Sequence, residues 1–365
     1  MGPFVFMSKI GEGTFSEVFA VRDERTGRRY ACKRLKRLFK TSGEISSFRE
    51  IRALRSLADH PNIIKFFDVL HDRRTGHLSL VFELMDMNVY DFIKDRSVPV
   101  PMTSVKLWIF QLLLALEFMH NMGVFHRDIK PENLMVSGNV LKVADLGSCK
   151  SVKSAPPFTD YISTRWYRAP ECLLTDGYYS KEMDIWATGC VMFEIMTLMP
   201  LFPGENELDQ INLIHEIFGT PMNIQSRVEL KSYTGNGLRS KFSHPFPDPQ
   251  TFTLLNQLLI YDYRNRISAT NALAHRCFGS IYDHFKSTMY VFFSSKFSPI
   301  FFRKFNRQTA RAIEDKRVAS KAILRGTNSI QIKSDWSYRA PPCCQSEKPA
   351  TNRIVFPKIK KIETM

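Results

Sequence analysis

A short polar segment and a carboxylate further along the chain give the strongest chemical signal in this sequence. The segment from His126 to Asn133 reads HRDIKPEN, and Asp145-Leu-Gly follows it. Asp128 can accept a hydroxyl proton, Lys130 can neutralise a moving phosphoryl group, and Asn133 and Asp145 can bind Mg²⁺. These are the parts that phosphoryl transfer requires. A polar loop formed by chance explains single residues but not the whole set in this order.

A glycine-rich segment near the N-terminus could hold phosphate. Gly11-Glu12-Gly13-Thr14-Phe15-Ser16 has GxGxxG spacing with serine in the third glycine position. In a dinucleotide-binding fold this segment would open a helix, but here an alternating strand over 17–22 follows. We therefore expect a flexible loop between antiparallel strands, in which glycines let backbone N–H groups reach phosphate oxygens. Taken alone, the segment could equally be an ordinary hairpin turn.

A lysine and a glutamate are placed where a strand and a helix could bring them together. Lys33 lies in the strand pattern YACKR, and Glu50 lies in the helical pattern FREI. A lysine that points into a protein interior needs an acidic partner. The alternative is that Lys33 belongs to a solvated basic run with Arg34, Lys36 and Arg37.

The elements that must position these residues change in type along the chain. The pattern predicts an antiparallel meander over 4–6, 17–22 and 30–34, a helix from about Ser46 capped by Ser46 or Ser47, and a buried strand over 77–84. Beyond a boundary near 85–88 the period becomes helical. The predicted helices cover 102–120 (a core helix ending near Gly123), 184–198, 209–218, 252–259 and 269–275, with loops over 219–249.

The positive charge is concentrated at one end of the chain. The 365 residues have a formal net charge of +15, and their hydrophobic content excludes overall disorder. Residues 1–278 contain 34 basic and 30 acidic side chains, whereas 279–365 contain 17 and 6. We expect this tail to be a disordered, solvated extension; the alternative is that its basic and aromatic residues bind nucleic acid, anionic membrane or acidic partners.

The cysteines and the N-terminal residues indicate where in the cell the protein is located. The seven cysteines are scattered without a CxxC pair, which predicts reduced thiols in a cytoplasmic or nuclear protein. No signal peptide fits before the glycine-rich segment, and we expect no transmembrane segment. The stretch Lys358-Ile-Lys360-Lys361 would be a weak nuclear signal.

Together the motifs resemble those of the eukaryotic protein kinases over about Phe4 to Phe278. The resemblance implies an α+β, bilobal fold. Its parts would be an N-lobe over 1–86 with a small antiparallel sheet and one key helix, a mostly helical C-lobe over 87–278, and the tail over 279–365. It also implies that ATP and Mg²⁺ are used.

The resemblance assigns roles to residues. Asp128 would be the catalytic base assisted by Lys130, Lys33 would contact the α and β phosphates while paired to Glu50, and Asn133 and Asp145 would bind Mg²⁺. The residues around the nucleotide would be Ile10, Gly11, Glu12, Gly13, Thr14, Phe15, Ser16, Glu17, Val18, Ala31, Lys33, Phe82, Glu83 and Met85, of which Glu83 to Met85 form the adenine hinge. Glu171, Asp184 and Arg266 would be structural, with Arg266 as the partner of Glu171.

The activation segment is similar to that of the cyclin-dependent and mitogen-activated kinase superfamily, and within it to the male germ cell-associated kinase group. Thr159-Asp160-Tyr161 precedes STRWYRAPE. The resemblance implies regulatory phosphorylation of Thr159 and Tyr161, with phosphate received by Arg49, Arg127 and Lys150. Lys150 stands where arginine is common, and it loses the bidentate fork. Leu146 replaces a common phenylalanine, and we expect activity to survive.

The same resemblance implies partners and places. We expect protein substrates with Ser/Thr-Pro sites, activation by an upstream kinase or by autophosphorylation, and a monomer. The expected location is the cytoplasm, with the nucleus and the cilium as further sites. The competing function is a catalytically weak kinase-fold scaffold whose basic tail binds anionic partners.

Overall fold

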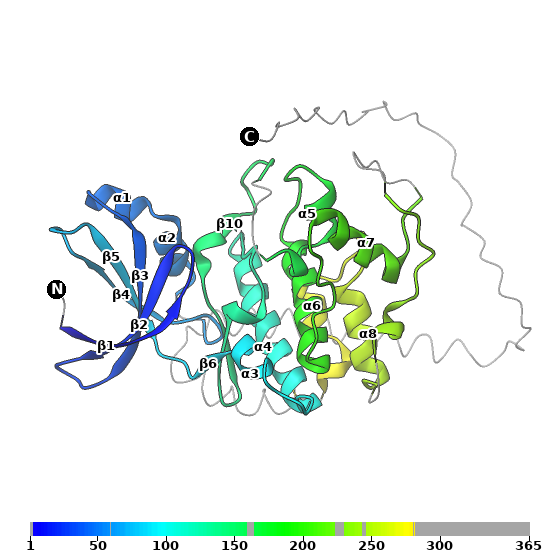
Figure 1. Cartoon of the computed structure of the whole chain (residues 1–365), viewed down its shortest axis with the longest axis horizontal. Helices are drawn as coiled ribbons and strands as arrows, with labels where there is room; N and C mark the ends of the chain where they lie inside the picture. The colour runs from blue at the N-terminus through cyan, green and yellow to red at the C-terminus, as the bar shows by residue number, and fades with distance from the viewer. Residues whose placement is uncertain are drawn as a thin grey trace, which may run out of the picture. The chain divides into compact units, whose positions relative to one another are not determined.

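The first third of the chain forms one five-stranded sheet in the computed structural model, which describes residues 3–279 and 281 except 59, 159–163, 223–229 and 243–245 (Figure 1). Every neighbouring pair is antiparallel in the order β1-β2-β3-β5-β4. The strands are β1 (Phe4–Glu12), β2 (Ser16–Asp23), β3 (Arg29–Leu38), β4 (Phe66–His71) and β5 (His77–Glu83). The predicted meander is therefore confirmed. The sequence pattern missed β4, an edge strand in which a register shift between Phe66 and Asp68 interrupts the alternation.

The predicted helix from Ser46 is wrong in its start and its cap. Two helices, α1 (Ser42–Ser47) and α2 (Arg49–Ser56), meet at Phe48, whose extended backbone interrupts them. The Thr41 side chain caps α1 by accepting from Glu44 N. Ser46 and Ser47 instead donate their hydroxyls to carbonyls three residues back, a local bond that competes with capping. The apolar spacing still places the buried face of α2 correctly.

The rest of the described chain is mostly helical, which confirms the expected α+β, two-lobed fold (Figure 1). The helices are α3 (Val89–Ile93), α4 (Met102–Asn121), α5 (Pro170–Leu174), α6 (Glu182–Thr197), α7 (Glu207–Phe218), α8 (Pro249–Leu258) and α9 (Ala269–Leu273). Short strands pair beside them: β8 (Leu134–Ser137) pairs with both β6 (Met87–Asn88) and β9 (Val140–Val143), and β7 (Val124–Phe125) pairs with β10 (Lys150–Ser151). Single 3₁₀ turns lie at Pro131–Asn133, Leu146–Ser148, Arg165–Tyr167, Leu238–Lys241 and Arg276–Phe278.

Two helices form the centre of the helical lobe. Buried residues occur on nearly all sides of α4 and α6, as expected for helices surrounded by other elements. Helix α4 is long and apolar enough to cross a membrane, but 67% of its apolar window is buried inside the fold. Gly123, just after the C-cap Met122, takes φ 73° and donates to His120 O, which ends the helix as predicted.

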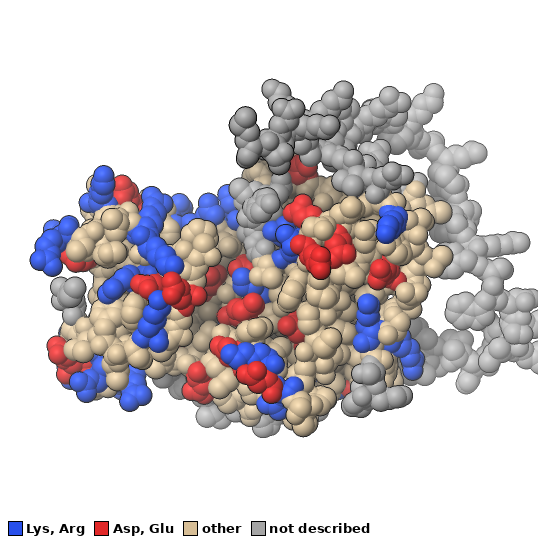
Figure 2. All heavy atoms as spheres, viewed as in Figure 1, with Lys and Arg blue, Asp and Glu red and all other residues tan. Residues whose placement is uncertain are grey.

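Basic side chains are unevenly distributed over the described surface. Figure 2 shows Lys and Arg gathered over the strands of the five-stranded sheet, while the helical lobe mixes both signs on this face. The basic tail lies outside the described residues except for Gly279 and Ile281. Its expected disorder and the proposed boundaries at 86 and 278 stay predictions.

Candidate functional site

The protein engages one oxygen of the Asp128 carboxylate and leaves the other without a hydrogen-bond partner among the described residues. Asn133 Nδ2 donates to Asp128 Oδ2 at 2.9 Å and to the Asp128 carbonyl at 2.8 Å, and Lys130 Nζ lies 3.2 Å from the same Oδ2. The 3₁₀ turn Pro131–Asn133 fixes this geometry. Asp128 Oδ1 is buried and has no hydrogen-bond partner among the described residues. One oxygen is thus fixed by the protein, and the other remains available to accept a proton.

Asp184, in the first turn of α6, supports the backbone of this loop. Its carboxylate accepts hydrogen bonds from His126 N and Arg127 N, both at 2.8 Å, and His120 Nε2 lies 2.9 Å away. Arg127 has φ 72°, in the left-handed region that non-glycine residues rarely adopt. Two charge-assisted bonds to a buried carboxylate compensate this backbone strain. Asp184 therefore holds the catalytic loop in shape.

Lys33 joins the sheet to the far side of the site. Its Nζ lies 2.7 Å from Glu50 Oε1 on α2 and 2.9 Å from Asp145 Oδ1. Burial opposes the charged form of Lys33, but the carboxylates of Glu50 and Asp145 outweigh it and raise its pKa. Burial raises the pKa of Glu50, whereas the Lys33 charge overcomes burial at Asp145 and lowers its pKa. The strand–helix pairing proposed from the sequence is present, and Lys33 is not one of a solvated run.

Asp145 and Asn133 supply a donor set that fits Mg²⁺. Asp145 is in the left-handed region at φ 56°, and the next residue, Leu146, is fully buried as a hydrophobic plug. The described residues contain no group of three His, Cys, Asp or Glu side chains that could hold a metal by themselves. One carboxylate and one amide suit Mg²⁺, which is usually held by one or two protein oxygens together with substrate phosphates and water.

The glycine-rich segment turns between two paired strands. Gly11 lies opposite Val18 and Glu12 opposite Glu17, and Gly13 N donates to Ser16 O at 2.8 Å. The Phe15 side chain at the turn is 81% exposed. The other predicted nucleotide residues on these strands and their turn are Ile10 and Thr14. The expected position of the segment between antiparallel strands is confirmed, whereas its flexibility stays a prediction.

The predicted adenine side lies on neighbouring strands. Ala31 on β3 is directly opposite Phe82 on β5, and Phe82 and Met85 are buried. Glu83 ends β5, and its carboxylate accepts from Lys65 N and from Lys142 Nζ. The apolar side chains and the hinge backbone thus meet at one end of the sheet.

The expected phosphate-receiving residues lie close enough to affect one another. Burial, and then the charges of Arg49 and Arg127, lower the pKa of Lys150. Arg127 also donates to Ser148 O at 2.6 Å and to Tyr179 Oη at 2.9 Å. The structure therefore gathers three cations from α2, the catalytic loop and β10. Thr159 and Tyr161 lie outside the described residues.

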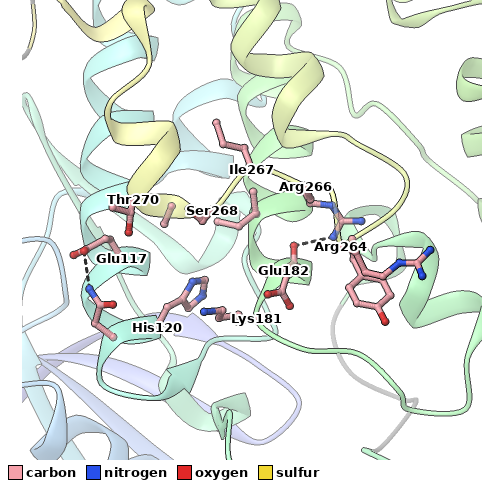
Figure 3. Close-up of a pocket in the computed structure, with 13 residues that line it drawn as sticks. Glu117, His120, Lys181, Glu182, Arg264, Arg266, Ile267, Ser268 and Thr270 are labelled. Atoms are coloured by element: carbon pink, nitrogen blue, oxygen red, sulfur yellow. Dashed lines mark hydrogen bonds between the residues drawn. The ribbon is translucent and has the colours of Figure 1, made fainter. Parts of the chain in front are cut away.

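A cavity of about 330 Å³ opens behind the catalytic loop, between the C-terminal end of α4, the N-terminal end of α6 and the segment before α9 (Figure 3). His120 lines it and contacts Asp184. Arg266 also lines it and makes two hydrogen bonds to Glu171. The cavity therefore borders the supports of the site and is separate from the reacting groups.

The sequence did not predict a buried hydrogen-bonded pair formed by a tyrosine and a glutamate. Tyr167 Oη donates to Glu194 Oε2 at 2.7 Å, and both side chains are buried. Burial raises the pKa of Glu194 to about 7, with the hydrogen bond from Tyr167 opposing it and the charge of Glu132 adding to it. Burial, and then Glu194, raise the pKa of Tyr167. His120 was missed as well. No local sequence pattern predicts the Tyr167–Glu194 pair or the role of His120, because the residues that form each contact are remote in sequence.

Comparisons with known proteins agree with this geometry. The protein kinase domain matches residues 4–278. The chain is 47% identical over 286 residues to MAPK/MAK/MRK overlapping kinase of Mus musculus, covering 74% of this chain and 66% of that protein. It is 46% identical over 284 residues to the Homo sapiens protein of the same name, with 74% and 67% covered.

A third relative is more distant. Serine/threonine-protein kinase MAK of Mus musculus is 37% identical over 287 residues, covering 76% of this chain and 46% of that protein. The matched region thus spans about two thirds of the overlapping kinases and about half of MAK. Within the male germ cell-associated kinase group the sequence motifs are most like those of MAPK/MAK/MRK overlapping kinase, MOK, and the comparisons confirm that resemblance.

Proposed function

This chain belongs to the protein kinase domain family, and from that premise we propose that it transfers the γ-phosphoryl group of ATP to serine and threonine hydroxyls of proteins. The similarity to serine/threonine-protein kinase MAK supports this choice of acceptor. The observation that carries the proposal is the arrangement around Asp128, whose Oδ2 is fixed by hydrogen bonds while Oδ1 is buried and has no hydrogen-bond partner among the described residues.

In this proposal the chain acts by position and charge. Asp128 Oδ1 accepts the proton of the attacking hydroxyl, while Asn133 keeps the carboxylate oriented. Lys130 offsets charge on the transferred group, and Lys33, held by Glu50, contacts the nucleotide phosphates. Asp145 and Asn133 would hold Mg²⁺, which supplies positive charge on the phosphate oxygens when it is bound.

Phosphorylation of Thr159 and Tyr161 would regulate the enzyme. Each phosphate adds about 1.5 to 2 negative charges, and Arg49, Arg127 and Lys150 form a cluster of matching charge. The source would be an upstream kinase or autophosphorylation. Thr159→Ala and Tyr161→Phe should each lower activity; full activity in both variants would exclude this regulation.

We further propose a preference for proline after the acceptor, by resemblance to the superfamily. The resemblance implies that Arg168 imposes this preference; its side chain is buried, and its Nη1 lies 2.9 Å from Glu207 Oε1. A degenerate peptide array, read for Ser/Thr-Pro against Ser/Thr followed by other residues, tests this preference.

Location and partners belong to the same proposal. We place the kinase in the cytoplasm, with the nucleus and the cilium as further sites, and we expect a monomer. The basic tail would meet an anionic partner or remain solvated. Salt-dependent binding of the full chain, compared with a chain ending at 281, to anionic vesicles or RNA separates these two outcomes.

The test of the function is an assay of the full chain with ATP, Mg²⁺ and a generic basic protein, followed by mapping of the modified sites. We expect phosphoserine and phosphothreonine on the substrate. No transfer by the wild-type chain, or equal transfer by Asp145→Asn, would contradict the assignment. The scaffold alternative is not favoured, because all six catalytic positions are filled by the expected residue types.

A further inference from the structure

We propose that the ion pair between Glu83 and Lys142 positions the hinge and thereby sets the affinity for ATP; this inference rests on the proposed function. Lys142 Nζ lies 2.7 Å from Glu83 Oε1 and 2.9 Å from Oε2. The two side chains are only 16% and 22% exposed, so solvent screens this pair less than a surface pair. Both oxygens of the carboxylate are therefore engaged by one cation.

Glu83 is fixed through its backbone as well. Its N–H donates to Lys65 O at 3.0 Å, and its carboxylate accepts from Lys65 N at 2.6 Å. Glu83 thus contacts Lys65, the residue before β4, on one side and Lys142 of β9 on the other. Because Glu83 is the first residue of the hinge, its orientation determines where the following backbone groups point.

Lys142 lies on a strand that is equally constrained. The next residue, Val143, donates to Asn62 O and accepts from Ile64 N, both at 2.8 Å. Two residues beyond Val143 the same segment reaches Asp145, which contacts Lys33. The pair therefore links the hinge of the sheet-bearing lobe to β9, which ends two residues before the candidate metal ligand Asp145.

The positive charge beside the Glu83 carboxylate belongs to Lys142 and not to the nearby His60. Burial, and then the charge of Lys142, lower the pKa of His60 to about 3, so His60 is neutral near pH 7. Without the ammonium of Lys142, the Glu83 carboxylate would keep the Lys65 N–H but lose its counter-charge. A half-buried carboxylate without a counter-charge turns toward water, and the hinge would move with it.

This arrangement predicts an effect on binding and not on the chemical step. Asp128 and Lys130 do not contact Glu83 or Lys142 in the described hydrogen bonds and ion pairs, so phosphoryl transfer should proceed at its normal rate once ATP is bound. Glu83 and Lys142 are thus positioning residues, and the Michaelis constant for ATP is the quantity that should respond.

The experiment measures kcat and the KM for ATP of the full chain at saturating peptide substrate. Lys142→Met and Glu83→Gln should each raise KM about five- to tenfold with kcat within about twofold. The double variant should raise KM no further than the more impaired single variant does, because both changes remove the same ion pair. Lys94→Met, which breaks an exposed pair with Asp91 at 2.8 Å, is the matched control and should change neither constant.

Other outcomes would overturn the inference. A merely structural pair would lower the melting temperature with KM unchanged, and independent residues would give additive effects in the double variant. A change in kcat at constant KM would place the pair in the chemical step. If the wild-type chain transfers no phosphoryl group, the proposed function fails, and the pair is still tested by the same fold-changes in the Kd of a fluorescent ATP analogue.

Discussion

Arg266 and Glu171, 95 positions apart, form a two-pronged ion pair in which the guanidinium donates to both carboxylate oxygens at 2.6 and 2.9 Å. Their side chains are 0% and 4% exposed. Arg266 also donates to the carbonyls of Ile260, Tyr261 and Glu182. The pair joins the start of α5 to the segment before α9, and its remaining donors are satisfied by backbone.

Removal of Arg266 should strongly destabilise the fold. Arg266→Ala leaves Glu171 buried without a counter-charge, and we expect the free energy of unfolding to fall by about 3–5 kcal/mol in urea denaturation. Arg266→Lys keeps the charge but loses the fork, and it should recover only part of that loss. Arg264→Ala, which removes an exposed pair with Asp262, is the control. Equal effects of Arg264→Ala and Arg266→Ala would show that burial of the pair is unimportant.

Loss of the Lys33 ammonium should abolish catalysis without unfolding the protein. Lys33→Met leaves Glu50 and Asp145 without their shared cation, and transfer from ATP should fall by about 10³-fold or more. Lys40→Met, at an exposed position on the same lobe, should retain full activity. Activity of Lys33→Met within tenfold of wild type would contradict this role.

Asp184 should matter through the loop that it holds. Asp184→Asn keeps one acceptor oxygen but turns an amide donor toward backbone N–H groups, so Arg127 should lose support for its left-handed backbone. We expect a loss of about 2–3 kcal/mol in unfolding free energy and a lower kcat with a smaller effect on KM for ATP. Asp91→Asn, at an exposed position on α3, should change neither the unfolding free energy nor kcat. A normal kcat in Asp184→Asn would contradict the supporting role.

The buried Glu194 should make stability depend on pH. Its pKa is raised from 4.5 to about 7, so between these values the folded state holds a proton that the unfolded state releases. Stability from this group is therefore present below about pH 4.5, declines as the pH rises, and is lost above about pH 7, by roughly 3 kcal/mol at most. Glu194→Gln keeps an acceptor for Tyr167 but cannot titrate. Urea denaturation between pH 5 and 8 should show a steeper decline for wild type than for Glu194→Gln; parallel curves would exclude this titration.

The sequence patterns were sufficient where a property is local. Strand patterns bounded by a turn signal placed β2 and β3, a short apolar run placed the buried strand β5, and uniformly apolar stretches predicted α4 and α6 as core helices. The order of Asp128, Lys130, Asn133 and Asp145 predicted the chemistry, because phosphoryl transfer needs these residue types at this spacing. The break at Phe48 was missed, since serines can either cap a helix or bond to carbonyls within it.

What the sequence determined by itself was the change from strands to helices along the chain, the types of the reacting groups and the family, because those depend on short-range spacing. Only the tertiary structure decided which groups are fixed. In the fold, Asp128 Oδ2 is engaged while Oδ1 has no hydrogen-bond partner among the described residues. His120 lies within hydrogen-bonding distance of Asp184, and Lys142 forms an ion pair with Glu83. These outcomes depend on burial and on contacts between residues that are remote in sequence. Burial strengthens electrostatic interactions, but it leaves no pattern in the sequence from which such contacts could be predicted.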